Sequence, residues 1–196
     1  DFHTMVSEMA KIDRKKAKTI NLGLFYGMGK GKLSSELGLT PGQAEDLFEK
    51  YHSRVPFVKE MIERTMKKAS DVGHVRTLLG RKCRFDLWEP SRYGVHKPLP
   101  RDEAEREHGK QIKRAFTYKA LNKIIQGSAA DMTKKAMVDL YHQGITPHIQ
   151  VHDELDCSFA DDVEKDRIIE IMSNAVQLEV PVKLDCEEGP SWGEAR

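Results

Sequence analysis

The sequence predicts an α+β fold that is mainly helical in its first half and carries a small antiparallel sheet near its carboxyl end. Helix start and stop signals recur between residues 13 and 73, which predicts several helices joined by short turns. Apolar and polar residues alternate from Ile149 to Phe159, as in paired strands, and a capping aspartate follows at Asp161. The sequence has no internal repeat and no low-complexity tract, so helices packed beside a partial sheet account for the whole pattern.

Caps mark the first predicted helices. Asp13 is placed to cap a helix that runs through Tyr26, and three glycines among residues 27–31 end it. The segment Thr40-Pro-Gly-Gln43 has the pattern of a capping box with proline at the first helical position. Residues 44–51 then follow an amphipathic pattern, so we expect a small helical hairpin here.

A longer helix is predicted from Pro56 to Val72, where Gly73 ends it. Its apolar side is expected to face the core and consists of Phe57, Met61, Ile62 and Met66. Residues 87–100 contain three prolines and no clear period, which predicts an ordered crossing or a flexible loop.

The second half begins with a long helical stretch, residues 101–142, which we expect to be interrupted near Gly127. After the alternating segment, a helix is predicted from the cap at Asp161 through Gln177. Its inward side is expected to consist of Val163, Ile168, Met172 and Val176. The alternation from Val180 to Cys186 predicts a final strand.

Composition limits the classes of protein that fit. Of the 196 residues, 39% are apolar and 32% charged, and no run approaches the length of a membrane span, so no membrane association is expected. The amino end lacks a charged-then-apolar signal region, which favours a cytoplasmic protein. Cys83, Cys157 and Cys186 are odd in number and lack a Cys-x-x-Cys pair, so we expect reduced thiols. The chain begins with Asp1 rather than Met, and we expect it to be truncated at its start.

Charge is unevenly distributed along the chain. Residues 1–100 carry 19 Lys/Arg against 12 Asp/Glu, whereas residues 101–196 carry 13 against 19. The first half is therefore suited to attract polyanions, and the second half to gather carboxylates around cations. Many two-lobed proteins show such asymmetry by chance, so it is consistent with polyanion binding without establishing it.

One row of side chains at four-residue spacing lies on a single face of the first basic helix: Arg14, Lys18, Leu22 and Tyr26. Two cations one turn apart, followed by an apolar and an aromatic position, suit a triphosphate with its sugar and base. Gly23 and Gly27 allow another backbone or a nucleic acid to approach closely. The alternative is a solvated basic helix end, which is the common interpretation of such a run.

A second informative segment places His152, Asp153 and Glu154 between two short apolar-alternating runs. A continuous strand would bury the carboxylate of Asp153 among apolar side chains, which is costly, so we predict a hairpin that turns at this triplet. Paired carboxylates at such an edge indicate a divalent cation. The alternative is that they are ordinary surface charges.

Together the two segments resemble those of family A DNA polymerases, which carry an Arg-x3-Lys-x7-Tyr-Gly helix in the fingers and a His-Asp-Glu hairpin in the palm. Further motifs extend the resemblance over nearly the whole chain. These are Asp1-Phe-His-Thr (an Asp-x-His element), Gly73-His-Val-Arg-Thr-Leu-Leu-Gly-Arg-Lys82, Asn122-Lys-Ile-Ile-Gln-Gly-Ser-Ala-Ala-Asp131 and the carboxyl end from Pro181 to Arg196. The resemblance implies a fingers subdomain at residues 1–100 and the carboxyl-terminal part of the palm at residues 101–196.

The resemblance implies nucleotide contacts on the basic helix. Arg14, Lys18 and His3 would hold the triphosphate, with a capping or surface histidine as the alternative for His3, and Lys18 would also protonate the departing pyrophosphate. Leu22 stands where the family mostly has Phe or Tyr against the sugar, so altered discrimination against dideoxynucleotides is expected, or else a leucine that packs in the fingers. Tyr26 would stack at the templating position, with a buried tyrosine as the alternative.

Further implied contacts lie in the second half. Asn122 and Gln126, one turn apart on a helix, would reach minor-groove acceptors, and His152 would contact the primer end. Asp153, with Glu154 as a secondary ligand, would bind two Mg²⁺ ions as in two-metal nucleotidyl transfer. The family's other metal-binding aspartate lies upstream of Asp1, so the isolated fragment is expected to be inactive.

The implied function is template-directed DNA synthesis, with primer-template DNA, dNTPs and an upstream polymerase segment as partners, in the cytoplasm of a bacterial or phage-infected cell. A single-subunit RNA polymerase fragment is the first alternative, although that class typically has His-Asp-Ser at the hairpin. A non-catalytic nucleic-acid-binding module is the second, and it would need no metal. The compact fingers and Leu22 favour a phage-like enzyme.

Overall fold

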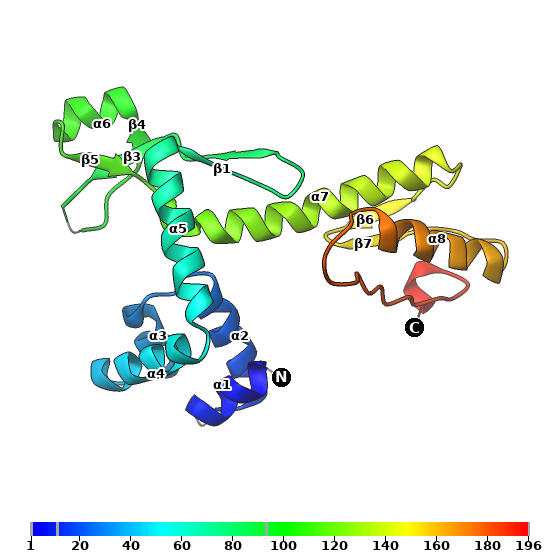
Figure 1. The fold of residues 1–196 in the computed structure, drawn as a ribbon, viewed down its shortest axis with the longest axis horizontal. Coiled ribbons are helices and arrows are strands. Elements are labelled where there is room, and N and C mark those ends of the chain that lie inside the picture. Colours follow the sequence, from blue (N-terminus) through cyan, green and yellow to red (C-terminus); the bar gives the residue numbers. More distant parts are fainter. Residues whose placement is uncertain (1, 11, 93, 196) are drawn as a thin grey trace. The chain divides into compact units, whose positions relative to one another are not determined.

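The computed structural model describes residues 2–10, 12–92 and 94–195 (Figure 1). Its helices are α1 (Phe2–Ala10), α2 (Arg14–Phe25), α3 (Lys30–Leu37), α4 (Pro41–Arg54), α5 (Pro56–Val72), α6 (Arg101–His108), α7 (Ala120–His142) and α8 (Asp162–Asn174), with 3-10 turns η1 (Thr117–Lys119) and η2 (Trp192–Glu194). Its strands are β1 (His74–Arg76), β2 (Lys82–Arg84), β3 (Leu87–Pro90), β4 (Leu99–Pro100), β5 (Ile112–Arg114), β6 (Ile149–Val151) and β7 (Glu154–Asp156). Helices combined with small antiparallel sheets confirm the predicted α+β class.

The strands form three separate small sheets. β1 pairs with β2, β6 pairs with β7, and β3 lies between β4 and β5, all antiparallel. The ring of Trp88 on β3 contacts two guanidinium groups, with Arg101 5.1 Å and Arg114 4.6 Å from its centre. These contacts tie α6 and β5 to the middle strand of their sheet.

The chain divides into two compact units. The first consists of Asp1–Arg76 and Gly80–Ile124, and the second of Thr77–Leu79 and Ile125–Arg196. This division falls inside α7 rather than at residue 100, so the assignment of fingers and palm subdomains stays a prediction.

The first unit has a helical core and a smaller second cluster. Helices α1 to α5 enclose the helical core, which consists of Val6, Ala17, Ile20, Leu24, Leu33, Leu47, Tyr51, Val55 and Val58. The second cluster joins the end of α5 to β1, β2 and α7 through Ala69, Val75, Phe85 and Ala120. In the second unit, the core residues are Leu140, Ile145 and Ile168.

Several predicted caps are confirmed. The Thr40 hydroxyl accepts a hydrogen bond from the Gln43 amide, and the Gln43 side chain accepts one from the Thr40 amide, which completes the capping box of α4. Gly73 ends α5 with φ +77°, and the Asp161 carboxylate accepts from the Glu164 amide at the start of α8. Sequence signals that act within four residues were therefore sufficient to place these helix ends.

Two predictions about the first half differ, in whole or in part, from the structure. Residues 87–100 contain β3 and β4 rather than only a crossing, because β5 pairs with β3 from beyond this segment and completes the sheet. On α5, the predicted Met61, Ile62 and Met66 are partly buried, and Ile62 packs against the helical core, but Phe57 is 51% exposed and the buried residues are Val58 and Ala69. Ala69 packs in the second cluster with Val75, Phe85 and Ala120.

Three predictions about the second half are also corrected. The helical stretch is interrupted at residues 109–119, where β5 pairs with β3, and Gly127 lies inside the continuous α7. Helix α8 ends at Asn174, and its Val163 is 78% exposed although Ile168 is buried as predicted. No strand forms over residues 180–186, since in the described part of the chain neither β6 nor β7 pairs with this segment.

Among the described residues, no helix combines the length and the apolar character that a membrane-spanning segment needs.

Candidate functional site

Helix α2 is anchored by one buried side. Ala17, Ile20, Asn21 and Leu24 are all at most 7% exposed and recur at three- and four-residue spacing. They hold the helix against the core of the first unit. Because one side is fixed in this way, the orientation of the opposite side is fixed as well.

The predicted row of α2 lies on the exposed part of the helix surface. Arg14 and Lys18 are exposed, and Leu22 is 43% exposed, so the two cations and the apolar position all face solvent. This arrangement presents a fork of donors and a point charge one turn apart, with an accessible apolar surface beside them. The alternative of a leucine that packs in the interior at position 22 does not fit its exposure.

Tyr26 follows the end of α2 and is only partly buried. Its ring meets Phe25 edge to face, with 5.7 Å between ring centres. Gly27 adopts φ +85°, and an added Cβ there would lie 3.6 Å from the Tyr118 carbonyl oxygen. The glycine therefore serves the turn after Tyr26, and the neighbour that approaches it is this chain's own backbone.

Gly23 is close to another part of the same unit. A Cβ at this position would collide with the Cε atom of Met28, whose side chain lies over the glycine. The space predicted for a nucleic acid or another backbone is thus occupied by a flexible side chain.

His3, on α1, connects to the buried side of α2. The Nδ1 atom of its ring lies 3.0 Å from Nδ2 of Asn21. Asn21 in turn accepts a hydrogen bond from the buried Tyr51 hydroxyl of α4, at 3.0 Å. Asp1, the first residue of the Asp-x-His element, lies outside the described residues.

The His-Asp-Glu triplet forms the predicted hairpin turn. Val151 and Glu154 pair across β6 and β7, so His152 and Asp153 are the two turn residues. His152 has φ +54°, a left-handed conformation that costs a non-glycine residue about 1 kcal/mol or more. The side chain of Gln150 donates a 2.5 Å hydrogen bond to the His152 carbonyl and so braces the turn. All three triplet residues are exposed, which confirms that no carboxylate is buried here.

Asn122 and Gln126 lie on α7, four residues apart, as predicted. Asn122 is partly buried and Gln126 is exposed. Continuous helix through this segment keeps their amides on one face, one turn apart. Each amide offers both a donor and an acceptor.

The turn fits a divalent cation in its donor chemistry. Asp153 and Glu154 offer exposed carboxylate oxygens, the ligands that Mg²⁺ prefers. Within residues 2–10, 12–92 and 94–195, however, no group of three or more His, Cys, Asp or Glu side chains is placed to hold a metal ion. By themselves, the two carboxylates of the hairpin are fewer donors than a divalent cation takes.

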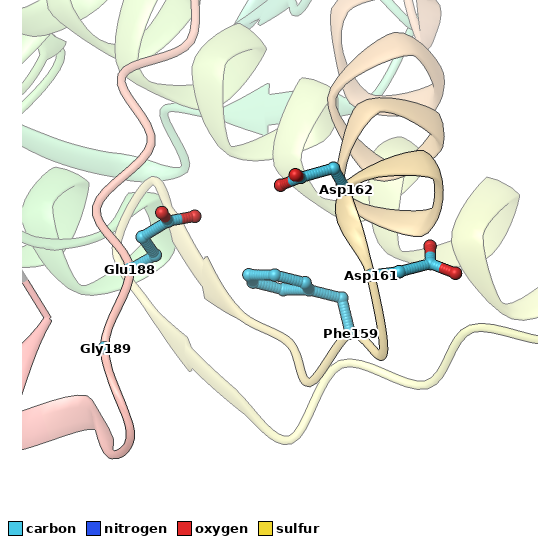
Figure 2. Close-up of a pocket in the computed structure, with 5 residues that line it drawn as sticks. All are labelled: Phe159, Asp161, Asp162, Glu188 and Gly189. Carbon is cyan, nitrogen blue, oxygen red and sulfur yellow. The ribbon is translucent and has the colours of Figure 1, made fainter.

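A shallow hollow elsewhere in the second unit is also lined by carboxylates. Figure 2 shows Asp162 and Glu188 facing one another across the hollow beside the Phe159 ring. Lys165 lies 2.8 Å from the first carboxylate and 3.1 Å from the second, and the hydrogen bond from Lys165 lowers the pKa of Asp162. Since Lys165 pairs with both acids, we interpret this hollow as a structural ion-pair cluster rather than a cation site.

Some residues of the site have no signal in the sequence. Asn21 and Tyr51 are buried polar residues thirty positions apart that meet only in the folded unit. In the sequence, Gln150 looks like an ordinary polar residue of an alternating strand, and only the structure shows its hydrogen bond to the His152 carbonyl oxygen. Asn21 gives one partial signal: it is a polar residue on the apolar side of α2, and a buried polar residue there needs a hydrogen-bond partner.

Comparison with known proteins identifies the class. The model of DNA polymerase family A matches residues 2–194, and the chain belongs to that family. A DNA-directed DNA polymerase of Pseudomonas phage M6 is 34% identical over 98% of this chain and 31% of the phage protein. The thermostable DNA polymerase I of Thermus filiformis is 36% identical over 93% of the chain and 21% of that enzyme.

A solved structure is similar as well. The polymerase domain of Pol1 from M. smegmatis, in complex with DNA primer-template and dNTP, aligns with a TM-score of 0.69 and 28% identity. The alignment covers 93% of this chain and 32% of that one. The chain thus spans about a third or less of the length of the relatives it matches.

Proposed function

We propose that residues 1–196 are the fingers and the carboxyl-terminal part of the palm of a template-directed DNA polymerase, which adds nucleotides from dNTPs to a primer 3′ hydroxyl. The observation that carries the proposal is the solvent-facing Arg14 and Lys18 row, on a chain that matches the family from residue 2 to 194. The DNA polymerase names of the relatives, and the primer-template and dNTP bound to the Pol1 neighbour, support it.

The basic row of α2 would bind the incoming triphosphate. Arg14 would contact two phosphate oxygens with its planar fork, and Lys18 would neutralise charge one turn further along. Phosphoryl transfer depends chiefly on positioning and charge neutralisation, both of which exposed cations on an anchored helix supply. Lys18 would also give a proton to the pyrophosphate as it leaves.

Two further positions of α2 and its end would select the nucleotide. Leu22 would lie against the sugar, where its exposed apolar surface offers contact without the rigidity of an aromatic ring. Tyr26 would stack at the templating position, since an aromatic face accepts every base. Asn122 and Gln126 would check the shape of the new pair through minor-groove acceptors that all pairs present.

Asp153, with Glu154, would hold Mg²⁺ at the hairpin turn, and an aspartate from a segment outside residues 1–196 would complete the ligand set. When bound, two such ions activate the attacking hydroxyl and stabilise the departing oxygen. His152 would contact the primer end from the same turn. Its left-handed backbone, braced by Gln150, fixes the direction in which the imidazole leaves the hairpin.

Primer extension tests the proposal. The chain alone and the chain joined to the amino-terminal polymerase segment of the Pseudomonas phage M6 relative would each receive primer-template, Mg²⁺ and either dNTPs or rNTPs. We expect extension by the joined protein with dNTPs and none by the chain alone. Extension with rNTPs would favour an RNA polymerase. Duplex binding that does not depend on Mg²⁺ or dNTP, with no extension of the primer, would favour a non-catalytic module.

A further inference from the structure

Three polar side chains from three helices meet on the buried side of α2. Tyr51 of α4 is 1% exposed and Asn21 of α2 is 7% exposed, whereas His3 of α1 is only partly buried. The Tyr51 hydroxyl lies 3.0 Å from Asn21 Oδ1, and Asn21 Nδ2 lies 3.0 Å from His3 Nδ1. The chain of hydrogen bonds thus runs from the core of the first unit outward to a histidine near its surface.

The direction of this chain follows from the donor and acceptor capacity of each group. Oδ1 of Asn21 accepts the proton of Tyr51, so the amide NH₂ is the group that faces His3. An NH₂ group only donates, and His3 Nδ1 must therefore be the unprotonated ring nitrogen. The proton of the neutral imidazole is then carried by Nε2, the nitrogen on the far side of the ring.

We propose that Asn21 and Tyr51 are positioning residues that hold His3 as the Nε2–H tautomer, so that Nε2 presents a hydrogen-bond donor to the phosphates of the incoming nucleotide. This inference rests on the proposed function, because it takes the ligand to be a nucleoside triphosphate. Asn21 lies one residue before Leu22 on the same helix as Arg14 and Lys18. The network therefore ties the histidine to the helix that carries the cations.

The Tyr51 hydroxyl favours this direction of the network. Burial raises the pKa of Tyr51 to about 12, so its hydroxyl remains a proton donor at the pH of any polymerase assay. If the Asn21 amide turned over, its NH₂ would face the hydroxyl and its oxygen would face Nδ1, and the ring would have to change tautomer as well. Tyr51 disfavours this rearrangement, because its hydroxyl proton, which now has Asn21 Oδ1 as its acceptor, would lose that acceptor in the core.

Nitrogen NMR of the histidine rings reads the tautomer directly, without any catalytic assay. The ¹⁵N-labelled chain would be measured at alkaline pH, where imidazole is neutral, and His3→Gln would identify the signals of His3. We expect an unprotonated Nδ1 and a protonated Nε2. The Asn21→Asp variant replaces the donor by a carboxylate acceptor and should move the proton to Nδ1, whereas Tyr51→Phe should give a mixture. A protonated Nδ1 in the native chain, or one unchanged tautomer in Tyr51→Phe, would overturn the inference.

Kinetics of the joined polymerase supply a second test. The loss of one hydrogen bond predicts that Tyr51→Phe raises the KM for dNTP about 2- to 10-fold, with kcat changed less. Tyr141→Phe removes the hydroxyl of a tyrosine that is 67% exposed on α7 and serves as the matched control. If Tyr51 acts through His3, its effect disappears in the His3→Ala background.

The two tests separate the possible failures. An effect of Tyr51→Phe that persists in the His3→Ala background would show a purely structural role and contradict the proposal. A joined protein that extends no primer would count against the proposed function, and the NMR result would still decide whether Asn21 and Tyr51 set the tautomer of His3.

Discussion

Gly73 ends α5 and opens the β1–β2 hairpin, and its replacement by alanine would perturb two features at once. Its φ of +77° is a conformation that alanine adopts only with strain. An added Cβ would also lie 2.6 Å from the guanidinium carbon of Arg114. That guanidinium is not free to move away, because it donates to the carbonyl oxygens of Ser70 and Phe85 and stacks on Trp88.

The expected cost is a sum of these two features. The left-handed backbone costs alanine about 1 kcal/mol once the smaller entropy of the unfolded chain is counted. Displacing Arg114 from its carbonyl partners and from the indole should add about 1 to 3 kcal/mol. We therefore expect Gly73→Ala to lower the free energy of unfolding of the first unit by about 2 to 4 kcal/mol.

Gly38 provides the matched control. It ends α3 with φ +64°, and an added Cβ there has no atom within 4 Å. Gly38→Ala should therefore cost only the backbone term of about 1 kcal/mol. Urea unfolding would be followed by the fluorescence of Trp88, with Trp192→Phe as background so that one tryptophan of the two reports.

The reasoning would be refuted by equal costs for Gly73→Ala and Gly38→Ala. A further check uses Arg114→Ala, which removes the group that the new Cβ would strike. In that background Gly73→Ala should cost no more than Gly38→Ala, because only the backbone strain remains.

Three other predictions follow from single side chains. Burial and the nearby charge of Lys59 lower the pKa of His52 below its usual 6.5, and Glu63 opposes them. As the pH falls, the unfolded chain therefore binds the proton before the folded chain does. The free energy of unfolding should then decrease as the pH drops below about 6.5. His52→Phe should flatten that pH dependence of unfolding, and an unchanged slope would contradict the assignment. In the joined polymerase, Lys18→Ala should lower the single-turnover incorporation rate about 100-fold, with Lys18→Arg retaining more of it; equal rates for native and Ala proteins would remove lysine from the mechanism. Leu22→Phe should change the ratio of dideoxynucleotide to deoxynucleotide incorporation, and identical ratios would end that hypothesis.

Local signals in the sequence predicted much of the helical framework and the hairpin. The capping box from Thr40 to Gln43 and the stop at Gly73 act within a few residues, so their structural outcome was readable without tertiary information. The turn at His152 was predicted because the alternative would have buried Asp153, and the structure has both side chains exposed. The energetic costs of an unsatisfied helix end or a buried carboxylate depend on the local residues, so they can be judged from the sequence.

Features that depend on distant partners were not readable in the same way. Strands β3 and β5 are short and are separated by more than twenty residues in the sequence, so no alternating hydrophobic pattern predicts their pairing. The alternation of Val180 to Cys186 is that of a strand, yet no partner completes it among the described residues. Similarly, Asn21 and Tyr51 carry no mutual signal, because only the packing of α2 against α4 brings them together.

The central claim is that the carboxylate of Asp153, at the hairpin turn, serves metal-dependent nucleotide addition. Single-turnover primer extension by the joined polymerase, with dNTPs and Mg²⁺, tests it most directly when native protein is compared with Asp153→Asn. Asn keeps the size of the side chain and removes the charge, and binding of primer-template would be measured in parallel. We expect extension by the native protein and its loss in the variant, with DNA binding retained. Equal extension by both proteins, or none by a native protein that binds primer-template, would contradict the account.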